Sequence, residues 1–517
     1  MIRIHQIKCE PGHFPGAEDI AKKLHCLPSE VEHFEIERES IDARHGEVTM
    51  IYTVLAKVRS EERYMHLRDV QRGFRYAYSL KEAVSDERPV VAGFGPAGMS
   101  AALILAESGL RPIVIERGKS VEERAVDVQR FFEHGILDPA SNVQYGEGGA
   151  GTFSDGKLTT RIKDPRVHKL LEEFVEAGAD KAILYQAMPH LGTDKLQQIV
   201  RNIRQKIVRL GGEVRFSCTL EHLLTENGRL RGAVTDQGII PCRHLVLCLG
   251  HSAADTYRNL FSQNIAMEQK DFAAGVRVEH PQEMIDRNQY GIYAGHPALG
   301  AAPYRLTHRA SDGRGVYSYC MCPGGIVIPA STEDGALVVN GMSYAARDGR
   351  NANSAILVQV HTADFDRGHP LDGFIFQQEL ETRAYREGFR APSQNIADYL
   401  HHQATDTLCI PSSYPLGNVP EEMHALFPAA IGTALEEGFR AFDKQIPGFI
   451  DRGIMVGMES RSSSPVRLRR TETGESVSLA GLYPCGEGAG YAGGIVSSGV
   501  DGIKQAENVI EDILNGQ

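Results

Sequence analysis

The stretch VVAGFGPAGMSAALILAESGLRPIVIE, residues 90–116, decides the fold. An apolar run enters the pattern Gly93-x-Gly95-x-x-Gly98, a helical segment follows, and a second apolar run ends at Glu116. Strand, glycine turn, helix, strand and acid in this order predict one βαβ unit of a dinucleotide-binding sheet.

Each element of this pattern has a physical task in the predicted unit. Gly93 permits the tight turn, Gly95 lets the backbone approach a pyrophosphate, and Gly98 lets the helix pack closely on the strand. The N-terminus of the helix offers free N–H groups to phosphates, and Glu116 is placed to bind the ribose hydroxyls of an adenosine. The alternative is a structural turn in an ordinary α/β protein, which would not require the acid.

Two further glycine-rich segments indicate that the ligand is long. Near the C-terminus, YPCGEGAGYAGGI (residues 483–495) leads from a strand into a helix predicted over 495–514, and Glu487 is placed to hydrogen-bond a ribityl hydroxyl. Between the two ends lies YGEGGAGTFSDGKL (residues 145–158), whose glycines favour a close backbone approach to an extended ligand. Together they favour FAD. The alternatives are a flexible surface loop for residues 145–158 and a glycine-rich loop with an exposed acid near the C-terminus.

The rest of the chain divides into predicted units around this motif. Residues 1–85 read as a small α+β module of βαββ pattern, with a helical segment expected after the charged stretch 59–63. We predict an α/β fold: a discontinuous Rossmann-like FAD-binding domain (88–260 and 451–517), interrupted by a mixed-sheet substrate domain (261–450).

Composition narrows the functional classes. The net charge of −12 argues against nucleic acid as a partner, and neither a signal peptide nor a long apolar stretch is present, which predicts a cytoplasmic protein that does not bind membranes. The nine cysteines are scattered, and no pair of CxxC motifs or HExxH motif indicates a metal. The sequence leaves the oligomeric state open.

The order of motifs resembles a known family. GxGxxG with its acid is followed by GGAGTFSDGKL, PHLGTD, LGHSAAD, CMCPGG, SSPVR and YPCGEGAGYAGGI. From residue 88 to the end the chain is similar to the bacterial FAD-dependent dehydrogenases, flavoproteins that are themselves similar to the glutathione-reductase type. The resemblance implies FAD and a redox fold but supplies no reaction. Because no second GxGxxG occurs in residues 260–450, NAD(P)H is expected only as a transient electron donor.

The resemblance also implies which residues hold FAD. They would contact FAD along its whole length, from the adenosine and pyrophosphate to the ribityl and flavin end. In chain order they are Gly93, Gly95, Pro96, Ala97, Gly98, Glu116, Arg117, Gly149, Ala150, Gly151, Thr152, Asp155, Gly156, Lys157, Leu220, Gly250, Gly486, Glu487, Gly493, Gly494 and Ile495.

Four residues are candidates for catalysis. Cys320 and Cys322 form a CxC pair that is either a redox or nucleophilic site or two small core residues of a strand. Lys157 is either a cation beside the flavin or a solvated lysine, and Arg461 is either a clamp for an anionic substrate or part of a surface basic run.

The leading hypothesis is an FAD-dependent oxidoreductase that transfers a hydride to or from a small molecule. The alternatives are an FAD-binding protein with an RNA-modifying, structural or partner-binding role, and a nucleotide-binding protein without flavin.

Overall fold

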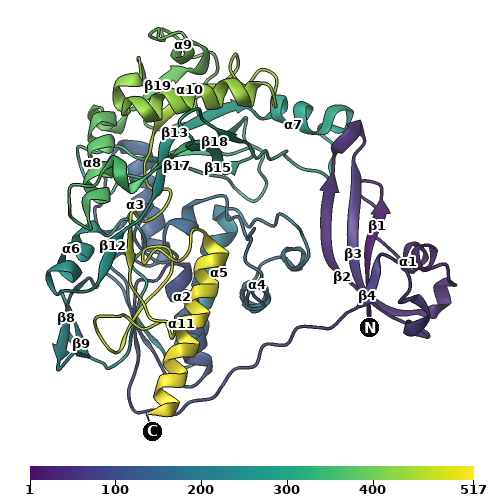
Figure 1. The fold of residues 1–517 in the computed structure, drawn as a ribbon, viewed down its shortest axis with the longest axis horizontal. Helices are drawn as coiled ribbons and strands as arrows, with labels where there is room; N and C mark the ends of the chain where they lie inside the picture. The colour runs from purple at the N-terminus through teal and green to yellow at the C-terminus, as the bar shows by residue number, and fades with distance from the viewer. Residues whose placement is uncertain (517) are drawn as a thin grey trace.

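A parallel five-stranded sheet carries the predicted βαβ unit (Figure 1). The structure, a computed structural model, describes residues 1–516. The strand order is β23-β11-β5-β6-β7, and every neighbouring pair is parallel. The strands are β5 (Val90–Ala92), β6 (Ile113–Ile115), β7 (Glu213–Arg215), β11 (Leu245–Leu247) and β23 (Leu482–Pro484). The last strand comes from the C-terminal segment, which confirms that this domain is discontinuous.

Helices cover this sheet because its strands are apolar on both faces. The apolar helix α2 (Pro96–Glu107) packs against α5 (Thr193–Arg209) and the C-terminal helix α11 (Ile495–Asn515) in one core. The other helices and the small three-stranded sheet of the domain are α3 (Val121–His134), α4 (Arg166–Glu176), α6 (Ala254–Ser262), β8 (Leu220–Glu226), β9 (Arg229–Thr235) and β10 (Gly238–Pro241). A short antiparallel pair, β12 (Met267–Gln269) and β22 (Val466–Leu468), joins the two halves of the chain.

The inserted domain, which runs from β13 to β21, is built on a seven-stranded sheet. Its order is β14-β15-β18-β13-β21-β19-β20, and it is mixed because β19 and β20 are parallel while the other pairs are antiparallel. The strands are β13 (Phe272–Pro281), β14 (Thr307–Arg309), β15 (Gly315–Cys322), β18 (Asn351–Val360), β19 (Ala391–Asn395), β20 (Asn418–Pro420) and β21 (Ile454–Glu459). Helices α7 (Gln282–Tyr290), α8 (Asp372–Ala384), α9 (Ile396–Leu400) and α10 (Ala429–Asp443) and the hairpin β16 (Ile326–Pro329)–β17 (Val339–Met342) complete it.

Two predicted boundaries of this domain need correction. The prediction returned the chain to the FAD-binding domain at residue 451, but β21 pairs with β13 and β19 of the inserted sheet. The prediction also began the inserted domain at 261, whereas β12 still pairs with β22 beside the five-stranded sheet. Strand pairing over this distance in sequence leaves no local signal, which explains both shifts.

The N-terminal module has the predicted βαββ core and one more strand. Its sheet order is β2-β3-β1-β4, with β1 (Ile2–Cys9), α1 (Ala17–Leu24), β2 (Val31–Asp42), β3 (Thr49–Val58) and the unpredicted β4 (Val70–Arg72). The helix expected after residue 63 is wrong: residues 61–64 form only a 3-10 turn, and residues 73–89 run without helix or strand along the molecule. Figure 1 shows this linker and the module beside the inserted domain.

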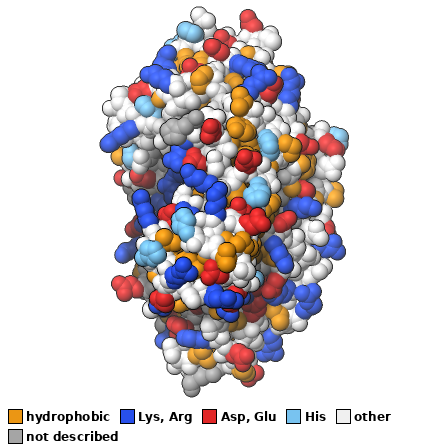
Figure 2. All heavy atoms as spheres, turned by 90° about the vertical axis from the view of Figure 1, so that its right-hand side faces the viewer, with side chains coloured by type: hydrophobic (Ala, Val, Ile, Leu, Met, Phe, Trp, Pro, Cys, Tyr) orange, Lys and Arg blue, Asp and Glu red, His pale blue; other side chains and the backbone are white. Residues whose placement is uncertain are grey.

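The module is attached to the rest of the chain by specific contacts. The amide of Glu39 donates to the carbonyl of Tyr185 (2.7 Å), and Ala187 donates back to Glu39 (2.8 Å). Figure 2 views the side that carries the module and shows acidic and basic side chains interspersed over it. Within residues 1–516 no helix combines the length and the apolar character that crossing a membrane requires.

Candidate functional site

The strand ends of the five-stranded sheet bring the predicted binding residues to one edge. Gly93 follows β5, Glu116 follows β6, and Gly486 follows β23 by one residue. Because all these strands are parallel, their carboxyl ends lie together, which is where ligands bind in open α/β sheets. Gly93 adopts a φ of 97°, and a Cβ there would lie 2.3 Å from the carbonyl oxygen of Cys248. Glycine is therefore required at position 93, because φ is positive there and because a side chain would clash with the adjacent strand end.

Glu116 lies in a groove suited to an adenosine. Its carboxylate accepts hydrogen bonds from the amides of Phe94 (2.8 Å), Gly118 (2.9 Å) and Gly146 (3.0 Å), which fix its position. The groove is also lined by Arg117, Tyr145, Cys218, Thr219 and Leu220.

Arg117 forms one wall of this groove. Its guanidinium lies over the ring of Tyr145, 4.7 Å from the centroid, and donates to Asp255 (2.8 Å) and Thr256 (2.8 Å). A planar group held in this way offers a flat face to a base. The structure thus brings together Glu116, Arg117 and Leu220 as the sequence predicted.

The distant glycine segments meet beside this groove. A Cβ on Gly486 would lie 2.7 Å from the Cβ of Ala97, and one on Gly151 would lie 3.2 Å from the side chain of Ile495. A Cβ on Gly488 would lie 2.2 Å from the carbonyl oxygen of Gly250. Residues that are hundreds of positions apart in the chain are therefore in close contact here, and glycine is what allows these contacts.

The middle loop is anchored by a residue that the sequence analysis missed. Arg124 of α3 is fully buried, and its guanidinium donates to the carbonyls of Asn142, Val143, Gly146, Glu147 and Gly149 at 2.6 to 3.3 Å. Burial lowers the pKa of Arg124 to about 10, so the group stays charged at neutral pH. An arginine inside an amphipathic helix carries no local signal for this task, because its partners come from another segment.

Two predicted cofactor residues of this loop turn inward. Asp155 is 3% exposed, pairs with Arg347 (Nε to Oδ1, 2.9 Å) and accepts from Ser343. Thr152 is 1% exposed, and its hydroxyl donates to the carbonyl of Glu147 (3.3 Å). Their side chains therefore hold the loop to its surroundings and do not point toward a ligand.

Two charged groups near the loop and the last helix lack ordinary partners. The Glu487 carboxylate makes no hydrogen bond or ion pair with any described residue, and burial raises its pKa to about 7 although Lys270 opposes the shift. The Lys157 Nζ is buried, has no hydrogen-bond partner among the described residues, and lies 3.6 Å from Asp155. Unsatisfied polar groups of this kind indicate places where a ligand completes the contacts.

Cys320 and Cys322 lie at the end of β15, next to Tyr319. The hydroxyl of the neighbouring Tyr319 donates to the carbonyl of Gly493 (2.8 Å), which joins β15 to the residues just before that helix. Cys320 is exposed, has a φ of 42° and is a free thiol, as is the buried Cys322. Although Cys320 reaches solvent, the protein packed around the thiol desolvates it and raises the pKa of Cys320 to about 12, and the nearby Lys157 offsets this only in part. Cys320 is thus a protonated thiol at neutral pH and not a ready nucleophile.

Arg461 is already engaged within the protein. Its Nε and Nη2 donate to the Glu381 carboxylate (2.8 and 2.6 Å), and its Nη1 donates to Thr332 (2.9 Å). The structure therefore joins Arg461 to α8, and the predicted role as a substrate clamp stays a prediction.

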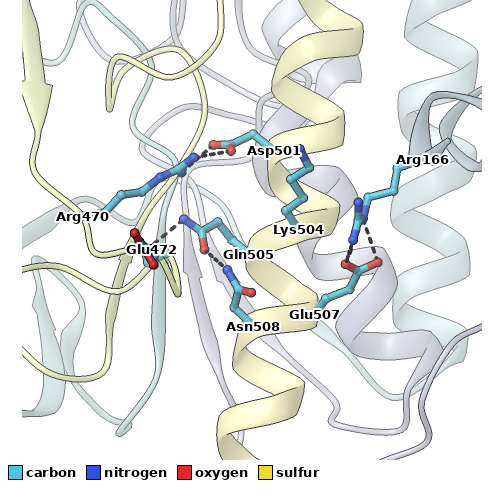
Figure 3. Close-up of a pocket in the computed structure, with 9 residues that line it drawn as sticks. Arg166, Arg470, Glu472, Asp501, Lys504, Gln505, Glu507 and Asn508 are labelled. Atoms are coloured by element: carbon cyan, nitrogen blue, oxygen red, sulfur yellow. Dashed lines mark hydrogen bonds and ion pairs between the residues drawn. The ribbon is translucent and has the colours of Figure 1, made fainter. Parts of the chain in front are cut away.

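A second pocket lies behind α11, between that helix and α4 (Figure 3). Its charges are used in ion pairs, Arg166 with Glu507 (2.6 Å) and Arg470 with Asp501 (2.7 Å). Asp501 also accepts from the amide of Gly486 (2.8 Å), so this cluster supports the glycine loop from behind.

The residues present fit FAD. The groove around Glu116 suits the adenosine, Gly250 and Gly493 face space in which a Cβ would meet no protein atom within 4 Å, and Glu487 and Lys157 provide polar groups without hydrogen-bond partners among the described residues. The N-terminus of α11, preceded by the exposed Gly493 and Gly494, favours negative charge.

Comparisons with known proteins give one family model that names FAD and several similar chains. Residues 271–462 match the family model described as "FAD-dependent protein, C-terminal domain-like", and residues 1–57 match a domain of unknown function. An uncharacterized protein of Clostridium beijerinckii is 46% identical over 506 residues, which are 95% of each chain. Protein FixC of Escherichia coli is 23% identical over 230 residues, 41% of this chain and 49% of FixC. A geranylgeranyl bacteriochlorophyll reductase-like structure from Thermoplasma acidophilum matches with a TM-score of 0.37 and 12% identity, covering 85% of this chain and 80% of its own.

Fold, site and domain match together define the class: an FAD-dependent protein built on a parallel dinucleotide-binding sheet. Within that class, the chain belongs to the family of the clostridial protein, which it matches over nearly its whole length.

Proposed function

We propose that this flavoprotein transfers a hydride between FAD and a small molecule held between the FAD-binding domain and the inserted sheet. The observation that carries the proposal is the contact between Tyr319 of β15 and Gly493 before α11, at 2.8 Å. This contact joins the inserted domain to the end of the site that suits a flavin. When bound, FAD would supply the hydride chemistry of its isoalloxazine ring.

The chain's own residues would bind and orient the reactants. Gly93, Ala97, Gly250 and Gly488 would hold the pyrophosphate, and Glu116 and Arg117 the adenosine. Glu487 would hydrogen-bond a ribityl hydroxyl.

Lys157 would place a positive charge near the reacting end of the site. The thiols of Cys320 and Cys322 would line that end as neutral groups, since burial raises the pKa of both.

NADH and NADPH are the first electron donors to test. No GxGxxG pattern occurs in residues 260–450, so such a donor would bind transiently. We also propose that the protein is related to the glutathione-reductase-type flavoproteins.

Absorbance spectroscopy of the purified protein tests the proposal. We expect flavin bands near ~450 nm, bleaching by NADH or NADPH without oxygen, and recovery when an oxidised substrate is added. A bound flavin that resists both donors and every reduced metabolite tried would contradict hydride transfer. It would favour a structural, partner-binding or RNA-modifying role instead.

A further inference from the structure

The inserted domain carries a cluster of two histidines and one glutamate far from the glycine segments. His402 follows α9, His424 begins a 3-10 turn, and Glu436 lies in α10. Figure 1 shows α9 and α10 at the outer end of the inserted domain, over the opposite side of its sheet from α2 and α11. No part of the proposed flavin chemistry uses these side chains.

The three side chains point their ligand atoms at one place. The Nε2 atoms of His402 and His424 each lie 3.2 Å from Oε1 of Glu436, and all three atoms lie within 4.8 Å of one another. Ligands on a tetrahedral zinc ion, at bond lengths of about 2.0–2.1 Å, are separated by about 3.3–3.4 Å. The spacing to Glu436 is therefore close to that of a coordination shell.

The surrounding residues prepare His424 and Glu436 as ligands. The Nδ1 of His424 contacts the Glu422 carboxylate, and a carboxylate on this nitrogen fixes the tautomer and leaves Nε2 free to bind a metal. Tyr399 stacks on the same ring at 3.8 Å, with the planes 2° apart. The second oxygen of Glu436 faces Arg440 (3.9 Å), which leaves Oε1 for an ion.

His402 is the mobile member of the set. Its ring stacks on His424 at 4.2 Å with the planes 15° apart, and two nearly parallel rings cannot both aim a lone pair at one ion. The side chain of His402 is 63% exposed, however, so it has room to rotate toward an ion held by His424 and Glu436. The remaining coordination position would face solvent and take water.

We propose that His402, His424 and Glu436 bind a divalent transition-metal ion, with zinc as the probe ion. Two imidazoles and one carboxylate suit zinc and its neighbours in the first transition row better than magnesium or calcium. The inference is independent of the proposed reaction, because the flavin groove contributes none of the ligands.

Titration of the full-length, chelator-treated flavoprotein with zinc tests this site. Binding is measured by calorimetry and by the zinc-dependent rise in melting temperature. We expect one site in the native protein. His402→Ala and Glu436→Gln should weaken zinc binding by about tenfold or more, and Glu422→Gln by about 10–100-fold. The exposed neighbour His401 provides the matched control, and His401→Ala should bind zinc as the native protein does.

A second group, Cys9, His13 and Asp19 in the N-terminal module, also has ligand atoms within 4.8 Å of one another. The Cys9→Ser variant distinguishes the two groups, and we expect it to bind zinc as the native protein does. The proposal is overturned if the native protein binds no zinc, if His402→Ala binds zinc like His401→Ala, or if only Cys9→Ser removes the site. Flavin absorbance serves as the check that each variant is folded.

Discussion

At the residue scale, Glu487 is unusual because its carboxylate makes no hydrogen bond or ion pair with any described residue, and Lys270 favours its charge only in part. Burial raises its pKa from 4.5 to about 7. A raised pKa in the folded state means that the stability contributed by the protonated carboxyl is complete below about pH 4.5 and is lost as the pH rises through 7. Between pH 5 and pH 8 this group therefore makes the flavin-free protein progressively less stable.

We predict that Glu487→Gln raises the melting temperature of the flavin-free protein at pH 8 and changes it little at pH 5. The glutamine cannot ionise, so it avoids the cost of a buried charge. Melting curves of both proteins across this range measure the difference, and the exposed Glu221→Gln is the control. Equal differences at both pH values would show that the carboxyl is not buried as described.

Cys320 gives a second prediction at the residue scale. Because burial raises its thiol pKa to about 12, the reactive thiolate is scarce at neutral pH despite the exposure of the side chain. Iodoacetamide should label Cys320 slowly at pH 7.5 and faster at each step toward pH 10, as followed by peptide mass spectrometry. Cys320→Ser identifies the peptide. Rapid labelling at pH 7.5 would restore the nucleophile interpretation.

At the element scale, α3 and the middle glycine loop act as one unit through Arg124. Five carbonyl groups converge on its guanidinium, and none of them belongs to α3 itself. The loop that faces Gly95 and Ile495 is thereby held, although its own secondary structure is limited to the 3-10 turn Ala150–Phe153.

We predict that Arg124→Met destabilises the protein by roughly 3 kcal/mol, because it leaves buried carbonyls without donors. FAD should also dissociate more readily, since the loop loses its anchor. Chemical denaturation and FAD fluorescence during dilution measure the two effects. Arg130→Met removes a half-exposed arginine of the same helix and should change neither, so equal effects of both substitutions would contradict the anchoring role.

At the scale of the whole molecule, the chain folds into three units, and the N-terminal module contributes no residue to the predicted FAD contacts. The predicted FAD contacts all come from residue 93 onward, whereas the module of residues 1–72 touches the body through Glu39 and through a shared apolar core. The linker is pinned near its far end, where the amide of Ala83 donates to Ser108 (2.9 Å) and the hydroxyl of Tyr78 donates to Glu507 (2.8 Å).

Limited proteolysis tests this arrangement. Phe74 is 77% exposed in the linker, so chymotrypsin should cleave there first. We expect the two fragments to elute together from a sizing column with FAD still bound, because the module stays attached by its own contacts. Phe74→Ala should slow the cut. Separation of the fragments, or loss of flavin on cleavage, would contradict the independence of the site from the linker.

The sequence alone predicted the βαβ unit with its glycine turn and the C-terminal strand and helix on either side of Glu487, because each depends on a local pattern, while the FAD contacts of Glu116 and Glu487 stay predictions. It also indicated the discontinuous domain, since two glycine segments far apart in the chain need one long ligand. The boundaries near 261 and 451, the inward turn of Asp155 and the pairing of Arg461 with Glu381 were decided by the tertiary structure. The carbonyl contacts of Arg124 and the meeting of His402, His424 and Glu436 were decided there as well. Each of these depends on partners from distant segments, and the residues next to a side chain in the sequence do not indicate which distant group it will contact.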